Sequence, residues 1–181
     1  MEEKDLKTLT KALLEVKSGN VDALEVVYDL TRKGVYFFVL PIMRTKEKAE
    51  DIMQNTYIQV YENIDKFDKS KNPLNWILTI SKNLALTEVK RNSKEIPTDF
   101  MESVNGDKVI NYDKQEFDTP LLDIANKVLS PSELQILMMY IQGDYKHREI
   151  AEILDIPIGT VTWKYNNALK KIKVELSKHG R

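Results

Sequence analysis

The sequence has 181 residues, of which 42% are hydrophobic and 30% charged, with only 6 Gly and 6 Pro. This composition supports buried cores and long regular elements, and it disfavours loop-rich all-β folds. There is no Cys, which excludes disulfides, thiolate metal ligands and Cys nucleophiles.

The first residues, MEEKDLKTLTKALLEV, are charged and amphipathic, so they do not match a secretory leader. The longest apolar run, Val35 to Met43, is too short to span a bilayer and contains Pro41. We therefore expect a cytoplasmic protein without membrane insertion.

The net charge of −1 hides a segregation along the chain. Residues 94–118 carry three basic and seven acidic side chains, whereas residues 159–181 carry six basic and one acidic. A basic C-terminal end behind an acidic segment indicates a nucleic-acid contact more strongly than the total suggests.

Residues 9–93 are predicted to form a helical domain. Asn20 is the expected N-cap of one helix, and Asn72 followed by Pro73 is expected to open another that runs to about Arg91. Between them, a helical stripe spaced at i, i+3, i+4, i+7 and i+11 predicts one buried face. Its members are Ala49, Ile52, Met53, Thr56 and Val60.

Residues 94–118 lose this periodicity and are predicted to be an extended, mobile linker. Helical patterning returns over residues 119–178, where three apolar stripes are separated by Gly143-Asp144 and by the segment from Asp155 to Pro157. The first stripe is Leu134, Leu137, Met138 and Ile141, the second Ile150, Ile153 and Leu154, and the third Val161, Tyr165, Ala168, Leu169, Ile172 and Leu176.

This order of a short helix, a tight turn and a longer basic helix predicts a helix-turn-helix. The face opposite the third stripe carries Trp163, Asn166, Asn167 and Lys170. Asn can bind adenine with two hydrogen bonds, and the lysines of this helix suit phosphates. An ordinary solvated helix face remains the alternative.

The segment SPSELQILMMYIQGDYKHREIAEILDIPIGTVTWKYNNALKKIK resembles region 4 of the extracytoplasmic-function (ECF) sigma factors, which belong to the sigma-70 family of bacterial RNA polymerase sigma factors. The resemblance implies that this domain recognises the −35 promoter element. The residues then expected at the DNA are Thr160, Thr162, Trp163, Lys164, Asn166, Asn167 and Lys170.

A second segment, AEDIMQNTYIQVYENIDKFD, resembles sigma region 2.2, the helix that docks on the coiled coil of the largest polymerase subunit. The face opposite the predicted buried stripe would bind core polymerase. Its members are Asp51, Gln54, Asn55 and Ile58.

A third segment, KNPLNWILTISKNLALTEVKRN, resembles regions 2.3 and 2.4, which recognise and open the −10 element. The resemblance implies a pocket for an unpaired base in the loop from Phe67 to Asn72, with a polar rim further along the helix. The expected residues are Phe67, Lys71, Asn72, Trp76, Lys82 and Asn83. Trp76 as a core aromatic residue is an open alternative.

Together these segments predict an all-α fold of two helical domains: a region 2 bundle at residues 9–93 and a region 4 helix-turn-helix at residues 119–178, joined by a flexible acidic linker at residues 94–118. The implied partners are core RNA polymerase, through its largest-subunit coiled coil and its flap, promoter DNA and an anti-sigma factor. The linker is expected either to pass through the basic RNA channel of the polymerase or to be a simple tether.

No catalytic residue, cofactor or metal site is expected, because the two histidines lie on separate segments and no nucleotide-binding or nucleophile motif is present. The main alternative function is a helix-turn-helix regulator that binds duplex DNA without polymerase. That alternative leaves residues 45–93 unexplained. A third candidate is a degenerate sigma-like module that mainly binds proteins.

Overall fold

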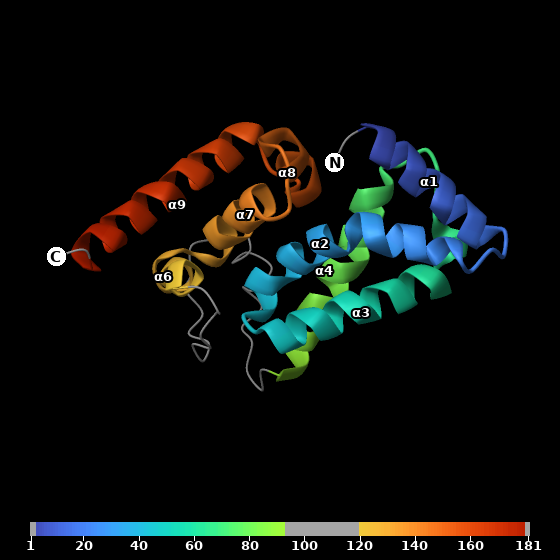
Figure 1. Cartoon of the computed structure of the whole chain (residues 1–181), viewed down its shortest axis with the longest axis horizontal. Coiled ribbons are helices and arrows are strands. Elements are labelled where there is room, and N and C mark those ends of the chain that lie inside the picture. The colour runs from blue at the N-terminus through green and yellow to red at the C-terminus, as the bar shows by residue number, and fades with distance from the viewer. Residues whose placement is uncertain (1–2, 93–119, 180–181) are drawn as a thin grey trace.

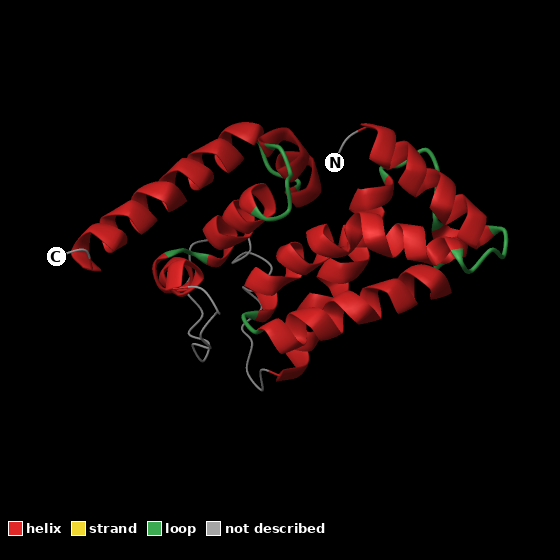
Figure 2. Ribbon diagram, in the orientation of Figure 1, coloured by secondary structure: helices red, strands yellow, loops and turns green. Residues whose placement is uncertain are grey.

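The computed structural model describes residues 3–92 and 120–179, and the regular structure within these ranges is helical, with loops between the helices (Figures 1 and 2). The predicted all-α fold is therefore confirmed, whereas the predicted linker lies outside the described residues. The elements are α1 (Glu3–Lys17), α2 (Ala23–Met43), α3 (Lys46–Glu62), the short 3₁₀ helix η1 (Ile64–Lys66), α4 (Pro73–Asn92), α6 (Pro120–Val128), α7 (Pro131–Ile141), α8 (His147–Leu154) and α9 (Ile158–His179).

In the N-terminal half, α2 packs against α1, α3 and α4 (Figure 1). Leu13 of α1, Val27 and Val35 of α2, Val60 of α3 and Ile77 of α4 are all fully buried where these helices meet. Burying a side chain of this size contributes roughly 1.5–3 kcal/mol. This half is thus a helical bundle with its own core.

The helix starts follow local capping chemistry. Thr45 caps α3 by accepting a hydrogen bond from the Lys48 amide at 3.3 Å. The Asn72 side chain accepts hydrogen bonds from the amides of Leu74 (3.0 Å) and Asn75 (3.2 Å), which confirms the predicted start of α4. The predicted stripe of α3 is also confirmed, since four of its five members are buried and the fifth, Met53, is half-buried.

Asn20 does not cap α2 with its side chain, so that prediction was wrong. The carbonyl of Asn20 accepts a bond from the Ala23 amide at 3.3 Å, in a turn that precedes the helix. Its own amide bonds back to Glu15 at 3.0 Å and completes the end of α1. Asn20 therefore belongs to the connection between two helices, a role that the same residue type favours.

In the C-terminal half, α7 is enclosed almost all round, and residues 132–139 are all buried. Of its predicted stripe, Leu134, Leu137 and Met138 are buried, but Ile141 is 53% exposed and was wrongly assigned to the core. Ile141 is the last residue of α7, just before the chain turns away at Gly143. Its position at the end of the helix therefore leaves Ile141 exposed, although the periodicity places it on the buried face.

The two halves pack against each other through α2 and α7 (Figure 1). The Gln135 side-chain amide of α7 donates to the Phe38 carbonyl of α2 at 3.2 Å, and Arg44 bonds to Asn126 of α6. Their buried apolar residues form one continuous cluster. The described parts of the predicted domains therefore lie in direct contact.

Candidate polymerase and nucleic-acid interfaces

The four residues predicted to bind core polymerase share one exposed face of α3. Asp51, Gln54, Asn55 and Ile58 are all exposed, while their neighbours Ile52 and Thr56 are buried. The exposed fraction of Ile58 is 54%, which is high for an isoleucine. An apolar side chain flanked by a carboxylate and two amides suits a partner helix that presents both apolar and basic groups.

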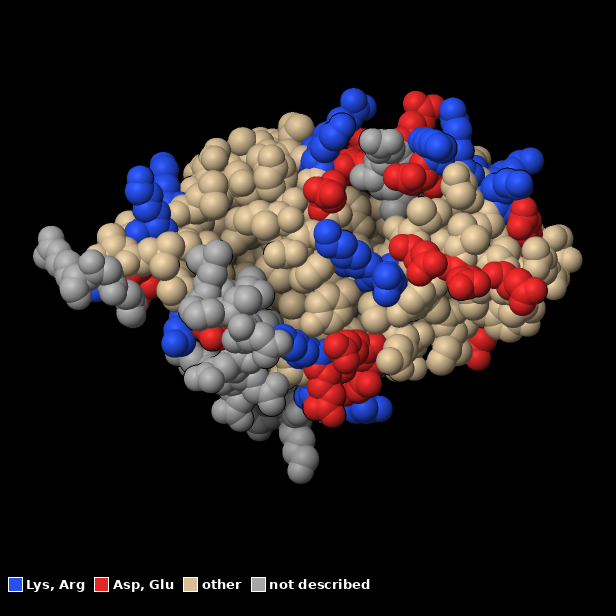
Figure 3. Space-filling view, in the orientation of Figure 1, with Lys and Arg blue, Asp and Glu red and all other residues tan. Residues whose placement is uncertain are grey.

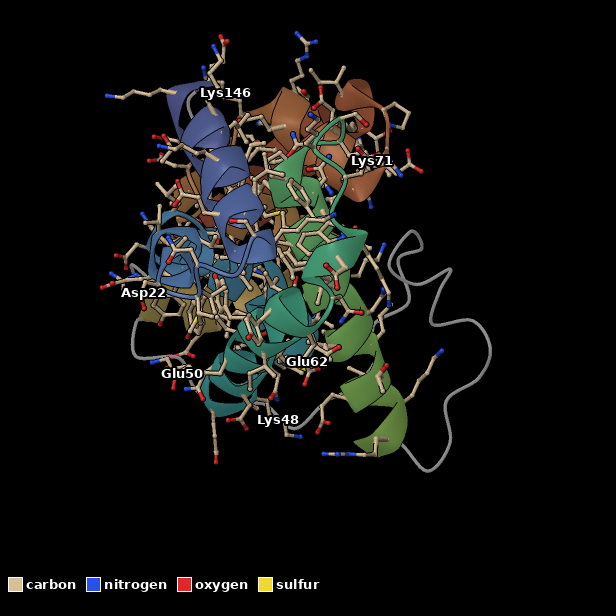
Figure 4. All side chains as sticks on the ribbon, turned by 90° about the vertical axis from the view of Figure 1, so that its right-hand side faces the viewer. Asp22, Lys48, Glu50, Glu62, Lys71 and Lys146 are labelled. Carbon is tan, nitrogen blue, oxygen red and sulfur yellow. The ribbon has the colours of Figure 1, made fainter. Side chains whose placement is uncertain are left out.

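The same face continues to the end of α3 through Tyr61, which is 46% exposed, and Glu62. Figure 4 shows Lys48, Glu50 and Glu62 pointing outward from this helix. Tyr61 was missed from the sequence, although its position three residues after Ile58 places it on the same face. Exposed tyrosines are favoured at protein interfaces, so Tyr61 joins the candidate surface.

The predicted base-binding loop is held by a dense set of bonds. Phe67 is buried, and its ring centre lies 5.2 Å from that of the half-buried Trp76. The Asp68 carboxylate accepts from the Ser70 amide at 2.9 Å and from its hydroxyl at 2.8 Å. These bonds lower the pKa of Asp68. Phe67 and Trp76 thus form the base of the loop, whereas Lys71, labelled in Figure 4, is exposed.

Lys82 and Asn83 lie two to three turns further along α4. With Asn75 and Thr79 they line a groove of about 690 Å³ whose opposite wall is formed by α8 and the turn after it. That wall carries Glu152 and Asp155 among its lining residues. The loop from Phe67 to Asn72 is not part of this groove, so the structure does not join the predicted pocket and rim in one cavity.

The C-terminal helices form the predicted helix-turn-helix. Asp155 ends α8 in the left-handed conformation, at φ 55°, and the amides of Asp155 and Ile156 both bond to the Ala151 carbonyl. Asp tolerates this conformation better than most residues. The turn then leads directly into α9, whose first two residues, Ile158 and Gly159, are exposed.

The start of α8 is tied to α9 by a cluster of rings. His147 lies 4.9 Å from both Tyr140 and Tyr165, measured between ring centres. Its Nδ1 atom is 3.2 Å from the hydroxyl oxygen of Thr162. These contacts fix the angle between the two helices, and they engage one of the predicted DNA-binding residues.

Four of the predicted DNA-binding residues lie on the exposed face of α9. Trp163 is 60% exposed, and Thr162, Asn166 and Lys170 are also exposed, while Thr160 is half-buried. Val161, Ala168 and Ile172 form the buried side of the helix, as predicted. Leu169 and Leu176 were expected there too but are 39% and 44% exposed, so the helices that contact α9, which are α6, α7 and α8, leave these two side chains partly uncovered.

Besides Thr162, which contacts His147, two more predicted DNA-binding residues have partners inside the domain. Lys164 is 8% exposed and donates to the Ser132 hydroxyl at 2.8 Å. Asn167 donates to the Glu133 carboxylate at 2.6 Å. A phosphate bound by Lys164 would have to replace this internal bond, so the predicted phosphate contact does not fit the folded domain well. The lysine's spacing alone could not reveal the buried hydroxyl.

Glu133 organises this part of the interface. It is 2% exposed, and its carboxylate accepts bonds from Lys171 at 2.8 and 2.9 Å and from the Ser130 amide at 2.9 Å. Burial by itself would raise the pKa of Glu133, but the bonds from Lys171, Ser130 and Asn167 outweigh it and lower the pKa. The carboxylate therefore stays charged and joins α7 to α9.

Figure 3 shows acidic and basic side chains interspersed over the α1–α3 half of one face, beside a broad uncharged area over α7 and much of α9. Within residues 3–92 and 120–179, no three acidic or histidine side chains lie together in a way that would hold a metal ion. In the same ranges, every helix is too short or too polar to cross a membrane.

Two family models match the chain. The model for sigma-70 region 2 covers residues 27–95, and the model for sigma-70 region 4 covers residues 127–172. The region 2 model covers residues 45–93, which a simple helix-turn-helix regulator leaves unexplained. The second coincides with the helix-turn-helix described above.

Relatives of similar length agree with the match to these two family models. The ECF RNA polymerase sigma factor SigW of Bacillus subtilis (strain 168) is 26% identical, over 93% of this chain and 96% of its own length. SigK of Mycobacterium sp. (strain JLS) is 24% identical, over 89% and 86%. The sigma factor RpoE, solved with the anti-sigma factor NepR from Bartonella quintana, shares the fold with a TM-score of 0.61, at 19% identity over 89% of this chain and all of that chain.

The chain therefore belongs to the sigma-70 family of RNA polymerase sigma factors, with a region 2 followed by a region 4. Within this family it is an ECF sigma factor, and its function is to bind core RNA polymerase and direct promoter-specific transcription initiation.

Proposed function

We propose that this ECF sigma factor distributes its function over three separate faces. The exposed side of α3 binds core polymerase, the loop before α4 together with the Lys82 and Asn83 side of α4 engages the −10 element, and the exposed side of α9 reads the −35 element. The observation that carries the proposal is the uniform exposure of Asp51, Gln54, Asn55 and Ile58 beside a fully formed core. Such a face has no role in the fold itself.

On α9, the proposal assigns base contacts to Trp163 and Asn166 and a phosphate contact to Lys170. All three are exposed on one side of the helix, and none has a partner in the core. An Asn that binds adenine with two hydrogen bonds gives roughly 1–3 kcal/mol of discrimination. Thr162 and Thr160 lie closer to the helix start, where backbone amides favour phosphates.

On region 2, Lys82 and Asn83 face carboxylates of the second half across the groove. A DNA strand that approaches Lys82 from this side meets the negative charges of Glu152 and Asp155. We infer that the two halves separate when the −10 element is bound.

The largest-subunit coiled coil of the polymerase is the contact proposed for α3, and the flap of the polymerase is the contact proposed for region 4.

An anti-sigma factor is proposed as a further partner. The solved structure of RpoE, which shares this fold, holds the anti-sigma factor NepR. A pull-down with candidate anti-sigma domains is the direct test, and competition with core polymerase is the expected result.

The first test is co-elution of the purified chain with bacterial core RNA polymerase. The variant Asp51→Arg plus Gln54→Ala should lose binding, because it reverses the charge and removes the amide on the α3 face. The matched control is Glu25→Arg plus Asn20→Ala, which makes the same two kinds of change at exposed positions near the start of α2. This control should bind like the unchanged protein.

Promoter selection on genomic fragments with the reconstituted holoenzyme then identifies the DNA sequences that the chain recognises. Binding of duplex DNA without polymerase binding would contradict the proposal and favour the helix-turn-helix regulator. Binding of neither would favour a sigma-like module that mainly binds proteins.

A further inference from the structure

Lys17, the last residue of α1, reaches the proposed −10 loop from far away in the sequence. Its ammonium group donates to the carbonyl of Asp65 at 2.8 Å and to the carbonyl of Phe67 at 3.0 Å. The loop that joins α3 to α4 passes behind α1 in Figure 1. The loop is thus bonded to a helix that precedes it by about fifty residues.

The end of α1 places Lys17 for this contact. Gly19 adopts φ 101°, a conformation that glycine takes at little cost. Its amide bonds to Val16 at 3.0 Å, and the next amide, of Asn20, bonds to Glu15 at 3.0 Å. This pair of bonds ends the helix in a Schellman motif, so Lys17 stands in the last turn, where a positive charge is favoured.

The two carbonyls need a donor from outside their own helix. Asp65 lies in η1, a single 3₁₀ turn, and Phe67 follows directly after it. Carbonyls at the end of such a turn have no partner further along the helix. An ammonium group satisfies both with charge-assisted bonds, and it also lies close enough to Asp68 to help lower the pKa of that carboxyl.

The other bonds that shape the loop are local. Asp68 bonds to Ser70, and Asn72 caps α4. These bonds set the turn of the loop, but they do not fix the loop relative to α1. The Lys17 contact does, at the point where Phe67 packs against Trp76.

We propose that Lys17 is a positioning residue for base capture: by fixing the carbonyls of Asp65 and Phe67, it holds the loop from Phe67 to Asn72 in the form that receives an unpaired base. The inference rests on the proposed −10 function of this loop. A loop ordered in advance loses less conformational entropy when it binds. In this proposal Lys17 acts through the loop and not on a nucleotide, so replacing it should affect recognition of the base more than binding of the phosphates.

The test compares Lys17→Met with Lys11→Met in the intact holoenzyme. Lys11 lies on the same helix and forms only an exposed pair with Glu15 at 3.6 Å, so its replacement removes the same charge without touching the loop. The probe is the non-template strand of a promoter recovered by the selection described above, with and without an abasic site at each −10 position. The ratio of the two affinities measures base capture.

In the unchanged protein, one abasic position should weaken binding strongly. Lys17→Met should reduce this preference by about fivefold. A change of this size is expected when binding must order roughly one more side chain or a short loop segment. Lys11→Met should keep the preference, and Lys17→Arg should restore most of it, because guanidinium can also donate to two carbonyls. Amide hydrogen exchange over residues 66–72 should rise in Lys17→Met alone.

The possible failures are distinct. If the unchanged protein shows no preference for any base, the proposed −10 function of the loop is wrong, and this inference falls with it. If the preference is present but Lys17→Met retains it, the loop captures the base without Lys17 and only this inference is overturned. Equal losses in Lys17→Met and Lys11→Met would likewise overturn it, since they would reflect charge alone.

Discussion

The hydroxyl group of Tyr145 lies against the backbone of Gly34, in the space that a Cβ atom would occupy in any other residue. Gly34 is buried in the middle of α2, and Tyr145, just before α8, is 2% exposed. The missing side chain therefore lets the second half of the molecule approach the first. The contact explains why a glycine stands inside a long helix.

Gly34→Ala should destabilise the protein by about 1–3 kcal/mol, since its methyl group would overlap the Tyr145 hydroxyl group. In an open helix the same change would stabilise by about 0.5–1 kcal/mol. Urea unfolding measures the difference. The cost should shrink in a Tyr145→Phe background, which removes the hydroxyl.

Gly159 provides the matched control. It lies in the first turn of α9, and a Cβ atom there would meet nothing within 4 Å. Gly159→Ala should leave the stability unchanged or slightly higher. If Gly34→Ala behaved in the same way, the packing of Tyr145 against α2 would be ruled out for the protein in solution.

The amphipathic helices at the edge of the bundle could be predicted from sequence, because one face of each is buried and the other is solvated. The stripe of α3 and the cap of α4 by Asn72 follow from local spacing and capping chemistry. The exposure of Trp163 also follows from sequence, because it lies on the face opposite the apolar stripe of α9. These features depend on residues within a few turns of each other.

Features that depend on distant partners could not be predicted. Lys164 looked like a phosphate ligand, because nothing near it in sequence announces the buried Ser132 hydroxyl. Leu169 looked like core, because periodicity does not tell how wide a strip the neighbouring helices cover. The contact of Tyr145 with Gly34 spans the two halves, and only the fold brings these residues together.

The buried carboxylate of Glu133 predicts a specific loss of stability in acid. Its pKa lies below the ordinary value of 4.5, so the folded state holds the ionised form more strongly than the unfolded state does. This contribution is fully present above pH 4.5 and is lost as the pH falls through the lowered pKa. The free energy of unfolding, measured by urea between pH 7 and pH 3, should therefore decrease as the pH is lowered.

Glu133→Gln should cost about 1.5–3 kcal/mol at neutral pH, because it removes the charge that Lys171 and Asn167 bind. Its difference from the unchanged protein should narrow in acid, where both carry a neutral group. Glu15→Gln, at an exposed carboxylate paired with Lys11, should have little effect. A constant difference across this pH range would show that packing, rather than charge, accounts for the loss.

The tyrosines predict the response to alkali. Burial, as the largest cause, raises the pKa of both Tyr57 and Tyr145, and Tyr57 also donates to the Thr31 hydroxyl oxygen at 3.0 Å. Their contribution to stability is intact below pH 10.0, which is the ordinary pKa of tyrosine, and it is lost as the pH rises towards the raised pKa. Unfolding should therefore accompany their ionisation.

Absorbance at the tyrosinate band should resolve this behaviour among the eight tyrosines. Tyr57→Phe and Tyr145→Phe should each remove amplitude from the late phase that coincides with unfolding. Early ionisation of Tyr57 would mean that its site is open to solvent.

Two lysines of α9 should separate DNA contact from folding. Lys170 is exposed, and its replacement by Ala should leave stability unchanged while reducing the magnitude of the salt slope of promoter binding by about 0.9, the value for one phosphate contact. Lys164 is buried against Ser132, so Lys164→Ala should cost about 1–3 kcal/mol of stability and leave the slope unchanged. Holoenzyme affinity for a selected promoter, measured over a series of salt concentrations, gives both slopes. A reduced slope in Lys164→Ala without loss of stability would mean that this lysine leaves its internal site to bind DNA.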